Sequence, residues 1–301
     1  MVSAADLTNH SGSGATDIHL LRDGDQYAVA IDGVIAARQA VAGVDSIQIA
    51  GTSGNDRFTL DAGIADTLSQ GGVLFLGGAG DDSLTVTGSN LSPVGLELRE
   101  GSGGELTWGT SRIALDSVES LRAQVTTKSW NVSTAIPQAL SVVGDSVHGS
   151  VRLAAAGLTH VELAVPSRSF QVTADQLELT GRLEIAGGAI DIQSRHDLSL
   201  ASGASWSASG GHVRLAAGPE GTTWVGGVVD VSSSTGVGGT IELLGGRVGV
   251  EGTARLDASG AFGGGSVHIG GEPTLAQQGG GLSTRVAVAD GAMILANAGL
   301  T

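Results

Sequence analysis

Apolar and polar residues alternate in short runs along most of the chain. These runs include residues 46–49, 73–76, 84–86, 96–98, 177–179, 183–185 and 190–192. A period of two with Val, Ile and Leu at the apolar positions is typical of strands that bury one face. We interpret residues 33–44, whose pattern is ambiguous, as strand and turn. Glycine clusters separate the runs, and we expect them to supply the positive φ that turns need. They are found at residues 71–72, 77–78, 103–104, 187–188 and 263–265.

The runs belong to a longer repeat. In the second half, strands open at Val172, Ile190, Val213, Ile241 and Val267. Adjacent units share an apolar-Asp/Ser-Ala/Val-Ser motif that is followed by a glycine turn. In the first half, residues 51–60 align with residues 77–86, and this offset is on the same length scale. A repeat of roughly 18–28 residues with three short strands is typical of a parallel β-solenoid, in which like positions of successive coils stack into one core.

We therefore predict an all-β fold, a right-handed parallel β-helix (β-solenoid) of roughly a dozen coils of about 18–28 residues. Residues 1–45 are expected to form an irregular N-terminal coil or cap, and residues 46–125 to form Gly/Asp-rich coils. Residues 126–170 are predicted as coils with longer excursions, and 171–301 as regular coils that continue beyond the fragment. A pair of β-sandwiches is the alternative. It is less favoured because sandwiches seldom repeat at this spacing and usually carry Trp and Tyr in the core.

The amino-acid composition argues against several classes of protein function. The 301 residues include 50 Gly and no Cys, and the net charge is −15. Without cysteine the chain has no disulfide and no thiolate metal site. An acidic chain with a single lysine, Lys128, is a poor partner for nucleic acid or an anionic membrane. No apolar run approaches the roughly 18 residues of a membrane helix, and the first residues lack the pattern of a signal peptide.

The second half resembles the repeats of filamentous-haemagglutinin-type exoproteins, the passengers of two-partner secretion, and of related giant bacterial adhesins. The resemblance depends on residues 256–260 (Leu-Asp-Ala-Ser-Gly), on the glycine-rich 263–271, and on 286–292 and 294–299. It covers about residues 170–301. Residues 1–125 look more like the Gly/Asp-rich repeats of large bacterial surface proteins. The Asn-Pro-containing secretion signature of the exoprotein family is absent, which favours an internal segment.

This resemblance implies a non-enzymatic structural and adhesive stalk in a large secreted or cell-surface bacterial protein. The expected location is extracellular. The expected partners are other segments of the same protein, and glycans or proteins on host or community surfaces. The apolar residues 293–300 look like an interior coil cut open, so we expect association through that end.

One motif carries candidate metal chemistry. Residues 77–85 satisfy the calcium-binding nonapeptide G-G-x-G-x-D-x-U-x, with Asp82 as its carboxylate ligand, and residues 51–59 nearly match it with Asp56 in the equivalent place. Calcium is therefore the one cofactor that we consider. True arrays repeat this motif in tandem, whereas these two copies lie a whole predicted coil apart. The alternative is that both segments only turn the chain at a solenoid corner.

A carbohydrate-active β-helix enzyme, a polysaccharide lyase or hydrolase, is the other function that we consider. It needs clustered carboxylates with a basic partner. The arginines at positions 182, 195, 214, 247 and 255 show no common register, and the seven histidines contain no metal-spaced pair. We therefore assign no catalytic residue. The four tryptophans, Trp108, Trp130, Trp206 and Trp224, would stack on sugar rings if exposed, with Trp206 and Trp224 on successive coils. Coverage of a solenoid flank is the alternative.

Overall fold

The chain folds into two long, mostly parallel sheets of stacked strands. The computed structural model describes residues 15–68, 72–91, 93–134, 139–155, 160–271 and 283–299, and apart from one short 3-10 helix the elements of these residues are strands. This confirms the all-β, parallel part of the prediction. The chain divides into two compact units. Unit 1 comprises residues up to Thr127 together with Ala154–Ala164, and unit 2 comprises Lys128–Leu153 and the chain from Val165 onward. The four predicted segments follow different boundaries and stay a prediction.

Unit 1 begins with an antiparallel meander of β1 (Asp17–Asp23), β2 (Gln26–Ile31) and β3 (Val34–Ala40). Its second turn places Asp32 and Gly33 at φ 49° and 78°, the pair of positive values that a tight two-residue hairpin requires. The strand predicted within residues 33–44 is β3.

The rest of unit 1 stacks strands in two sheets. Sheet A contains β1, β5 (Arg57–Asp61), β7 (Ser83–Leu91), β11 (Ser120–Thr127) and β15 (His160–Ala164), paired in parallel in that order. Sheet B pairs β4 (Ser46–Ala50), β6 (Gly72–Leu76) and β10 (Ser111–Asp116) in parallel. Two antiparallel strands, β9 (Gly103–Trp108) and β8 (Val94–Arg99), extend sheet B beyond β10. The 3-10 helix η2 (Ala62–Thr67) follows β5.

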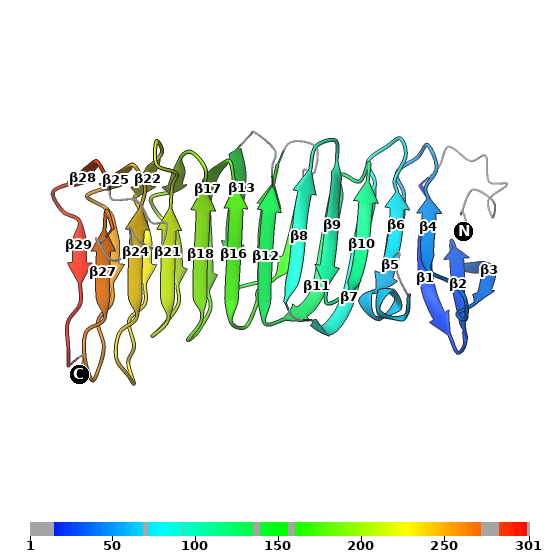
Figure 1. The fold of residues 1–301 in the computed structure, drawn as a ribbon, viewed down its shortest axis with the longest axis horizontal. Helices are drawn as coiled ribbons and strands as arrows, with labels where there is room; N and C mark the ends of the chain where they lie inside the picture. Colours follow the sequence, from blue (N-terminus) through cyan, green and yellow to red (C-terminus); the bar gives the residue numbers. More distant parts are fainter. Residues whose placement is uncertain are drawn as a thin grey trace. The chain divides into compact units, whose positions relative to one another are not determined.

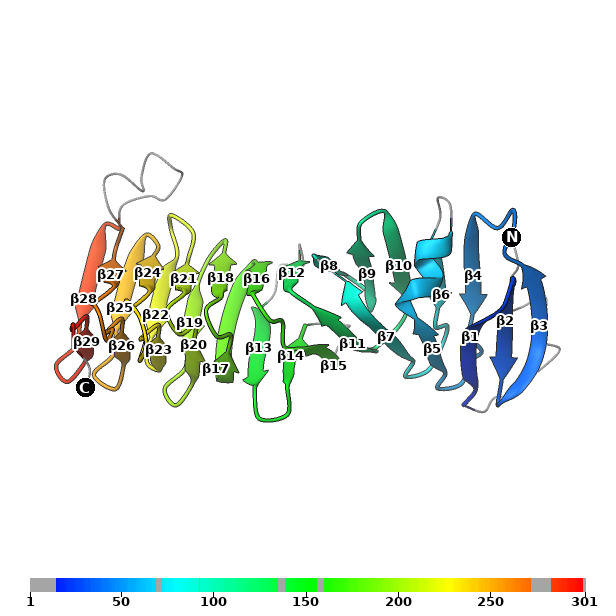
Figure 2. The same cartoon turned by 90° about the horizontal axis from the view of Figure 1, so that it is seen from below.

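Unit 2 is more regular, because each complete coil has one strand in sheet B and two short strands in sheet A (Figures 1 and 2). Sheet B contains β12 (Ser129–Thr134), β16 (Ser169–Ala174), β18 (Ala189–Ser194), β21 (His212–Ala216), β24 (Thr240–Leu244) and β27 (Ser266–Ile269). The paired short strands of sheet A are β19 (Leu198–Leu200) and β20 (Ser205–Ser207), β22 (Thr222–Val225) and β23 (Val228–Asp230), β25 (Arg247–Val250) and β26 (Arg255–Asp257), and β28 (Arg285–Val288) and β29 (Met293–Leu295). Sheet A also contains β13 (Ala139–Asp145), β14 (Ser150–Ala154) and β17 (Gln176–Glu184).

Like positions of unit 2 stack into buried columns. In sheet B, one column contains Phe170, Ile190, Val213 and Ile241, which are in register along four successive strands and are fully buried. Val267 continues the column but is only half-buried. The parallel column of Val172, Ile192, Leu215 and Leu243 repeats the pattern. Burial of an aliphatic side chain stabilises by about 1.5–3 kcal/mol, so each buried member of these columns contributes to the stability of this unit.

One predicted spacing is wrong. Ile190 pairs with Phe170, and Val172 pairs with Ile192. The first repeat therefore runs from Phe170 to Ile190 and is longer than the predicted interval, which began at Val172. The period of two does not fix the register, because Phe170 and Val172 both point inward from β16.

The predicted role of the glycine clusters is only partly right. Gly72, Gly78 and Gly187 have positive φ. Gly188, Gly211, Gly239 and Gly265 do not, and they form a column instead. A Cβ on Gly211, Gly239 or Gly265 would collide with the carbonyl oxygen of the glycine one coil earlier, and a Cβ on Gly188 would collide with the carbonyl of Arg168. These glycines are therefore needed for close approach of successive coils. Residue 71 lies outside the described residues.

Candidate functional site

Asp56 and Asp82, the predicted calcium ligands, occupy equivalent corners of successive coils in unit 1. Each directly precedes a strand of sheet A, and those strands pair Arg57 with Ser83 and Phe58 with Leu84. The offset between the two motif copies, which the sequence alignment predicted, is therefore the true coil length here. The two aspartates are 0% and 1% exposed, which is unusual for carboxylates and requires partners.

The partners form a ladder that runs through successive coils. The Asp56 Oδ1 atom accepts from the backbone amide of Thr16 at 3.1 Å. The Asp56 amide in turn donates to Asp82 Oδ1 at 2.7 Å, and the Asp82 amide donates to Glu119 Oε2 at 2.8 Å. At each step, a carboxylate of the later coil accepts from the backbone of the earlier one. We call this chain of bonds the carboxylate ladder.

The two aspartates differ in their second oxygen. The Asp56 Oδ2 atom accepts from the amide and the hydroxyl of Thr52, at 2.5 and 3.0 Å. In the next coil the equivalent of Thr52 is Gly78, which has no hydroxyl and adopts φ +105°. The Asp82 Oδ2 atom is buried and has no hydrogen-bond partner among the described residues. Burial is the main reason that the pKa of Asp82 is raised above its ordinary value of 3.8; the Asp56 amide opposes this effect, and the charges of Asp56, Glu119 and Asp81 add to it.

This geometry does not fit a calcium site. Calcium takes six to eight oxygen ligands, yet three of the four Asp56 and Asp82 oxygens already accept hydrogen bonds from protein donors. Over the described residues, no group of three or more His, Asp or Glu side chains is arranged to hold a metal ion. The corner-turn alternative therefore explains the two aspartates better, and calcium binding stays a prediction.

Glu119 is a member of the ladder that the motif search missed. It does not belong to a Gly-x-Gly-x-Asp segment, and the antiparallel β8 and β9 make its coil longer than the preceding one. All three acidic residues share a simpler sequence pattern. Asp56, Asp82 and Glu119 each stand two residues before the first buried apolar residue of a sheet A strand, which is Phe58, Leu84 or Leu121.

Three of the four tryptophans are buried, which contradicts their role as sugar-stacking side chains. Trp130 and Trp206 are fully buried, and Trp108 is nearly so. Their hydrogen bonds fit a structural role, since the Trp206 indole donates to the Thr180 carbonyl and that of Trp108 donates to Asp66. Trp206 and Trp224 are not neighbours in register: Trp206 pairs with Leu183 and Val229, whereas Trp224 pairs with Ser199 and Gly249. Trp224 alone among the tryptophans is exposed, at 46%.

Charged side chains of unit 2 form pairs within turns and between neighbouring coils. Arg214 lies between Asp191 and Glu242, at 3.4 and 3.7 Å, on the outward face of sheet B. His196 contacts Asp175 at 3.1 Å, and His148 contacts Asp145 at 2.8 Å. The Arg214 pairs are half-buried, whereas the imidazoles of His148 and His196 are exposed, and exposed ion pairs contribute little to stability. They place the predicted arginines and histidines on solvated faces.

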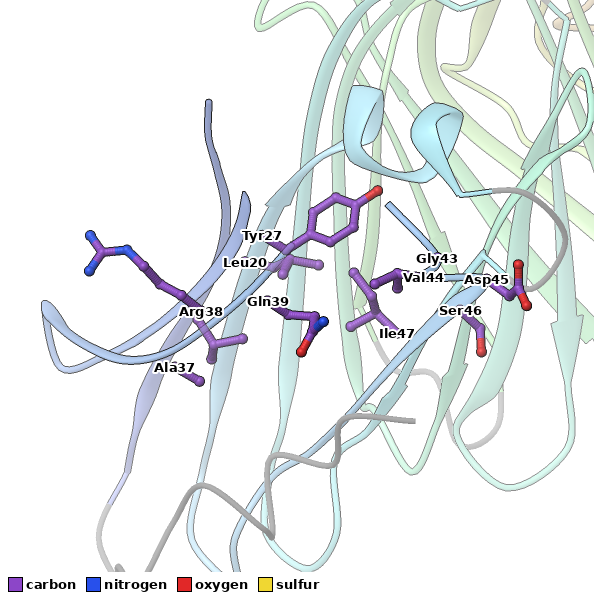
Figure 3. Close-up of a pocket in the computed structure, with 11 residues that line it drawn as sticks. Leu20, Tyr27, Ala37, Arg38, Gln39, Gly43, Val44, Asp45, Ser46 and Ile47 are labelled. Atoms are coloured by element: carbon purple, nitrogen blue, oxygen red, sulfur yellow. The ribbon is translucent and has the colours of Figure 1, made fainter. Parts of the chain in front are cut away.

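A cavity of unit 1 lies beside the meander and has a volume of about 460 Å³. Leu20, Tyr27 and Ile47 form its apolar floor, and Gln39 and Ser46 stand at its rim (Figure 3). The Tyr27 hydroxyl is engaged elsewhere, in a 2.6 Å hydrogen bond to Thr67. In Figure 3 the Arg38 guanidinium points away from the cavity, where it contacts Asp23 at 3.2 Å. The polar groups therefore do not converge on one ligand position.

Comparison with models of protein families, with curated proteins and with solved structures found no match. Within the described part of the chain, no helix is long and apolar enough to cross a membrane.

Proposed function

We propose that the chain is a non-enzymatic structural and adhesive stalk segment of a large secreted or cell-surface bacterial protein. Its coils would belong to one right-handed parallel β-helix of roughly a dozen turns. The function is then geometric, since stacked coils hold binding regions away from the cell. The expected neighbours are further segments of the same protein, and the expected external partners are surface glycans or proteins. The location is extracellular, at the bacterial cell surface.

The observation that carries this proposal is the repetition of one coil design through unit 2. From β18 to β26, each coil places a strand in sheet B and two in sheet A, and each strand pairs with its equivalent in the next coil. The corner after the second strand also repeats, because Asp230 and Asp257 each accept from the amide two residues later, at 2.8 and 2.9 Å. A stalk needs a coil design that repeats and adds length with each turn.

The corresponding experiment removes one whole coil. Deletion of residues 212–239 joins Gly211 to Thr240, which occupies the same register position as His212. The stalk proposal predicts that this variant folds cooperatively with a melting temperature within a few degrees of the wild type. Deletion of 226–239 removes only β23 and its corner, and we expect it to unfold unit 2. If the whole-coil deletion destroys cooperative folding as completely as the shorter one, the modular stalk is wrong.

The enzymatic alternative has its own test. The purified chain is incubated with neutral and acidic polysaccharides, and reducing ends and unsaturated products are measured. The stalk proposal predicts no release above the level of a heat-denatured sample. Release that the wild type shows and the denatured chain does not would establish the carbohydrate-active enzyme instead.

A further inference from the structure

A shallow groove crosses sheet A of unit 2 beside the one exposed tryptophan. It has a volume of about 300 Å³ and lies over β13, β17, β19 and β22. Its lining includes Gln176, Glu178, Asp197, Ser199 and Trp224. Three strand steps of about 4.8 Å give it a length of about 14 Å. An indole, carboxylates, an amide and a hydroxyl therefore share one elongated surface.

The indole of Trp224 is held as a platform. Its ring lies over Gly249 of the next coil, so closely that a Cβ on Gly249 would collide with the ring carbons. The indole Nε1 donates a hydrogen bond to Glu251 Oε1. The glycine and the glutamate together fix the ring against the sheet while 46% of the residue stays exposed. A fixed aromatic face avoids much of the conformational entropy that binding would otherwise cost.

Polar side chains lie beside the Trp224 ring at matching outward positions of the neighbouring strands. Glu178, Ser199 and Trp224 are aligned across β17, β19 and β22. Within the described residues, the side chain of Glu178 has no hydrogen bond or ion pair. Asp197, an exposed residue, accepts from the Thr222 amide at 2.8 Å through Oδ1, and its Oδ2 has no hydrogen bond within the described residues. Hydroxyl-rich ligands need such acceptors next to an apolar face.

We propose that this groove binds a neutral oligosaccharide, with one sugar ring stacked on Trp224 and hydroxyl groups donating to Glu178 and Asp197. Sugar rings present C–H groups on a flat face, which suits an aromatic platform. The two carboxylates and the net charge of −15 disfavour uronic or sulfated glycans by repulsion. The proposal gives the adhesive part of the proposed function a defined site, and it depends on that function only for its biological role.

Isothermal titration calorimetry and tryptophan emission test this site on the full chain. The probes are hexasaccharides of the cello, chito, manno and malto series, with polygalacturonate and heparin as anionic probes. We expect saturable binding of at least one neutral probe, with a Kd on the order of micromolar to millimolar. We also expect a change in the emission of the exposed tryptophan and weaker or no binding of both anionic probes.

Three variants identify the residues responsible. Trp224→Ala is expected to weaken binding at least about tenfold. Gly249→Ala keeps the tryptophan but displaces its ring, so it should also weaken binding. Phe262→Ala is the matched control, because it removes an aromatic side chain that is 81% exposed but does not line the groove. It should leave the affinity unchanged. Circular dichroism and melting curves verify that each variant is folded.

The proposal is overturned if no neutral hexasaccharide binds, or if Trp224→Ala binds as tightly as the wild type. Preferential binding of heparin or polygalacturonate would also contradict it. These results are separate from the test of the stalk. The whole-coil deletion removes Trp224 together with residues 212–239, so it should fold normally and still fail to bind the neutral probe.

Discussion

The second carboxylate oxygen of Asp82 lacks both the amide and the hydroxyl donor that Thr52 provides to Asp56, and this difference gives the molecule a titrating group in its core. A folded-state pKa above the ordinary value means that the folded chain binds the proton more tightly than the unfolded chain does. The associated stability is fully present below pH 3.8 and is lost as the pH rises through the raised pKa. At neutral pH the ionised Asp82 therefore destabilises unit 1.

Replacement of this carboxylate is expected to stabilise the protein. Asp82→Asn keeps an oxygen that accepts from the Asp56 amide and removes the buried charge, so the free energy of unfolding at pH 7 should rise. The advantage should shrink as the pH falls towards 4. Asp56→Asn is the matched control and should destabilise, because both Asp56 oxygens already accept hydrogen bonds. Urea unfolding at several pH values measures both. A loss of stability in Asp82→Asn at pH 7 would contradict this account.

Within a single strand, side chains point alternately inward and outward, so the position of a residue in this alternation decides whether it is buried. Trp206 stands between Ser205 and Ser207 in the inward phase of its strand, whereas Trp224 alternates with the buried Thr223 and Val225. The alternation in the sequence was therefore enough to distinguish the buried Trp206 from the exposed Trp224. The antiparallel β8–β9 insertion was not predictable in this way, because alternation within a strand does not specify the direction of its partner. The glycine column was missed for a related reason, since close approach depends on the neighbouring coil.

The column of Gly188, Gly211, Gly239 and Gly265 leads to a prediction about the packing of neighbouring coils. Gly239→Ala places a methyl group against the carbonyl of Gly211, and backbone on both sides leaves no flexible group to move. We expect a loss of about 1–3 kcal/mol or more in the free energy of unfolding. Gly263→Ala is the matched control: it lies in the equivalent turn of the next coil, where a Cβ would make only ordinary contact with Val237. It should change stability by less than about 0.5 kcal/mol. Equal effects of the two substitutions, measured by chemical denaturation, would show that the column does not set the coil spacing.

At the scale of the whole molecule, the two interpretations of Asp56 and Asp82 predict different melting behaviour. The aspartates either bind calcium or only stabilise the turn at a corner of the coil. Hydrogen bonds from protein donors occupy three of the four carboxylate oxygens of Asp56 and Asp82, which leaves too few ligands for calcium. We therefore expect the same melting temperature in millimolar calcium and in excess EDTA, measured by calorimetry at constant ionic strength, since a chain with net charge −15 also responds to salt. A calcium-dependent rise of several degrees that disappears in Asp82→Asn would instead identify Asp82 as a ligand.

The sequence predicted the all-β, mostly parallel arrangement of the chain, but it was less informative about the candidate sites. The predicted offset between Asp56 and Asp82 was correct, because both copies have the same loop length. Glu119 escaped the search because 37 residues separate it from Asp82. The groove beside Trp224 combines residues from four strands, and its composition becomes visible only when their register is known.

The direction of the carboxylate ladder has a consequence for biosynthesis. Every acid belongs to the coil that is made later, and the amide it satisfies belongs to the coil that is made earlier. A chain that emerges with its N-terminus first, from a ribosome or through a secretion pore, therefore completes each corner only after the next coil has appeared. The most recently made coil therefore has a corner amide without its carboxylate acceptor, and the acid of the next coil accepts a hydrogen bond from that amide. In unit 1 the amide of each corner therefore gains its carboxylate acceptor only when the next coil is in place.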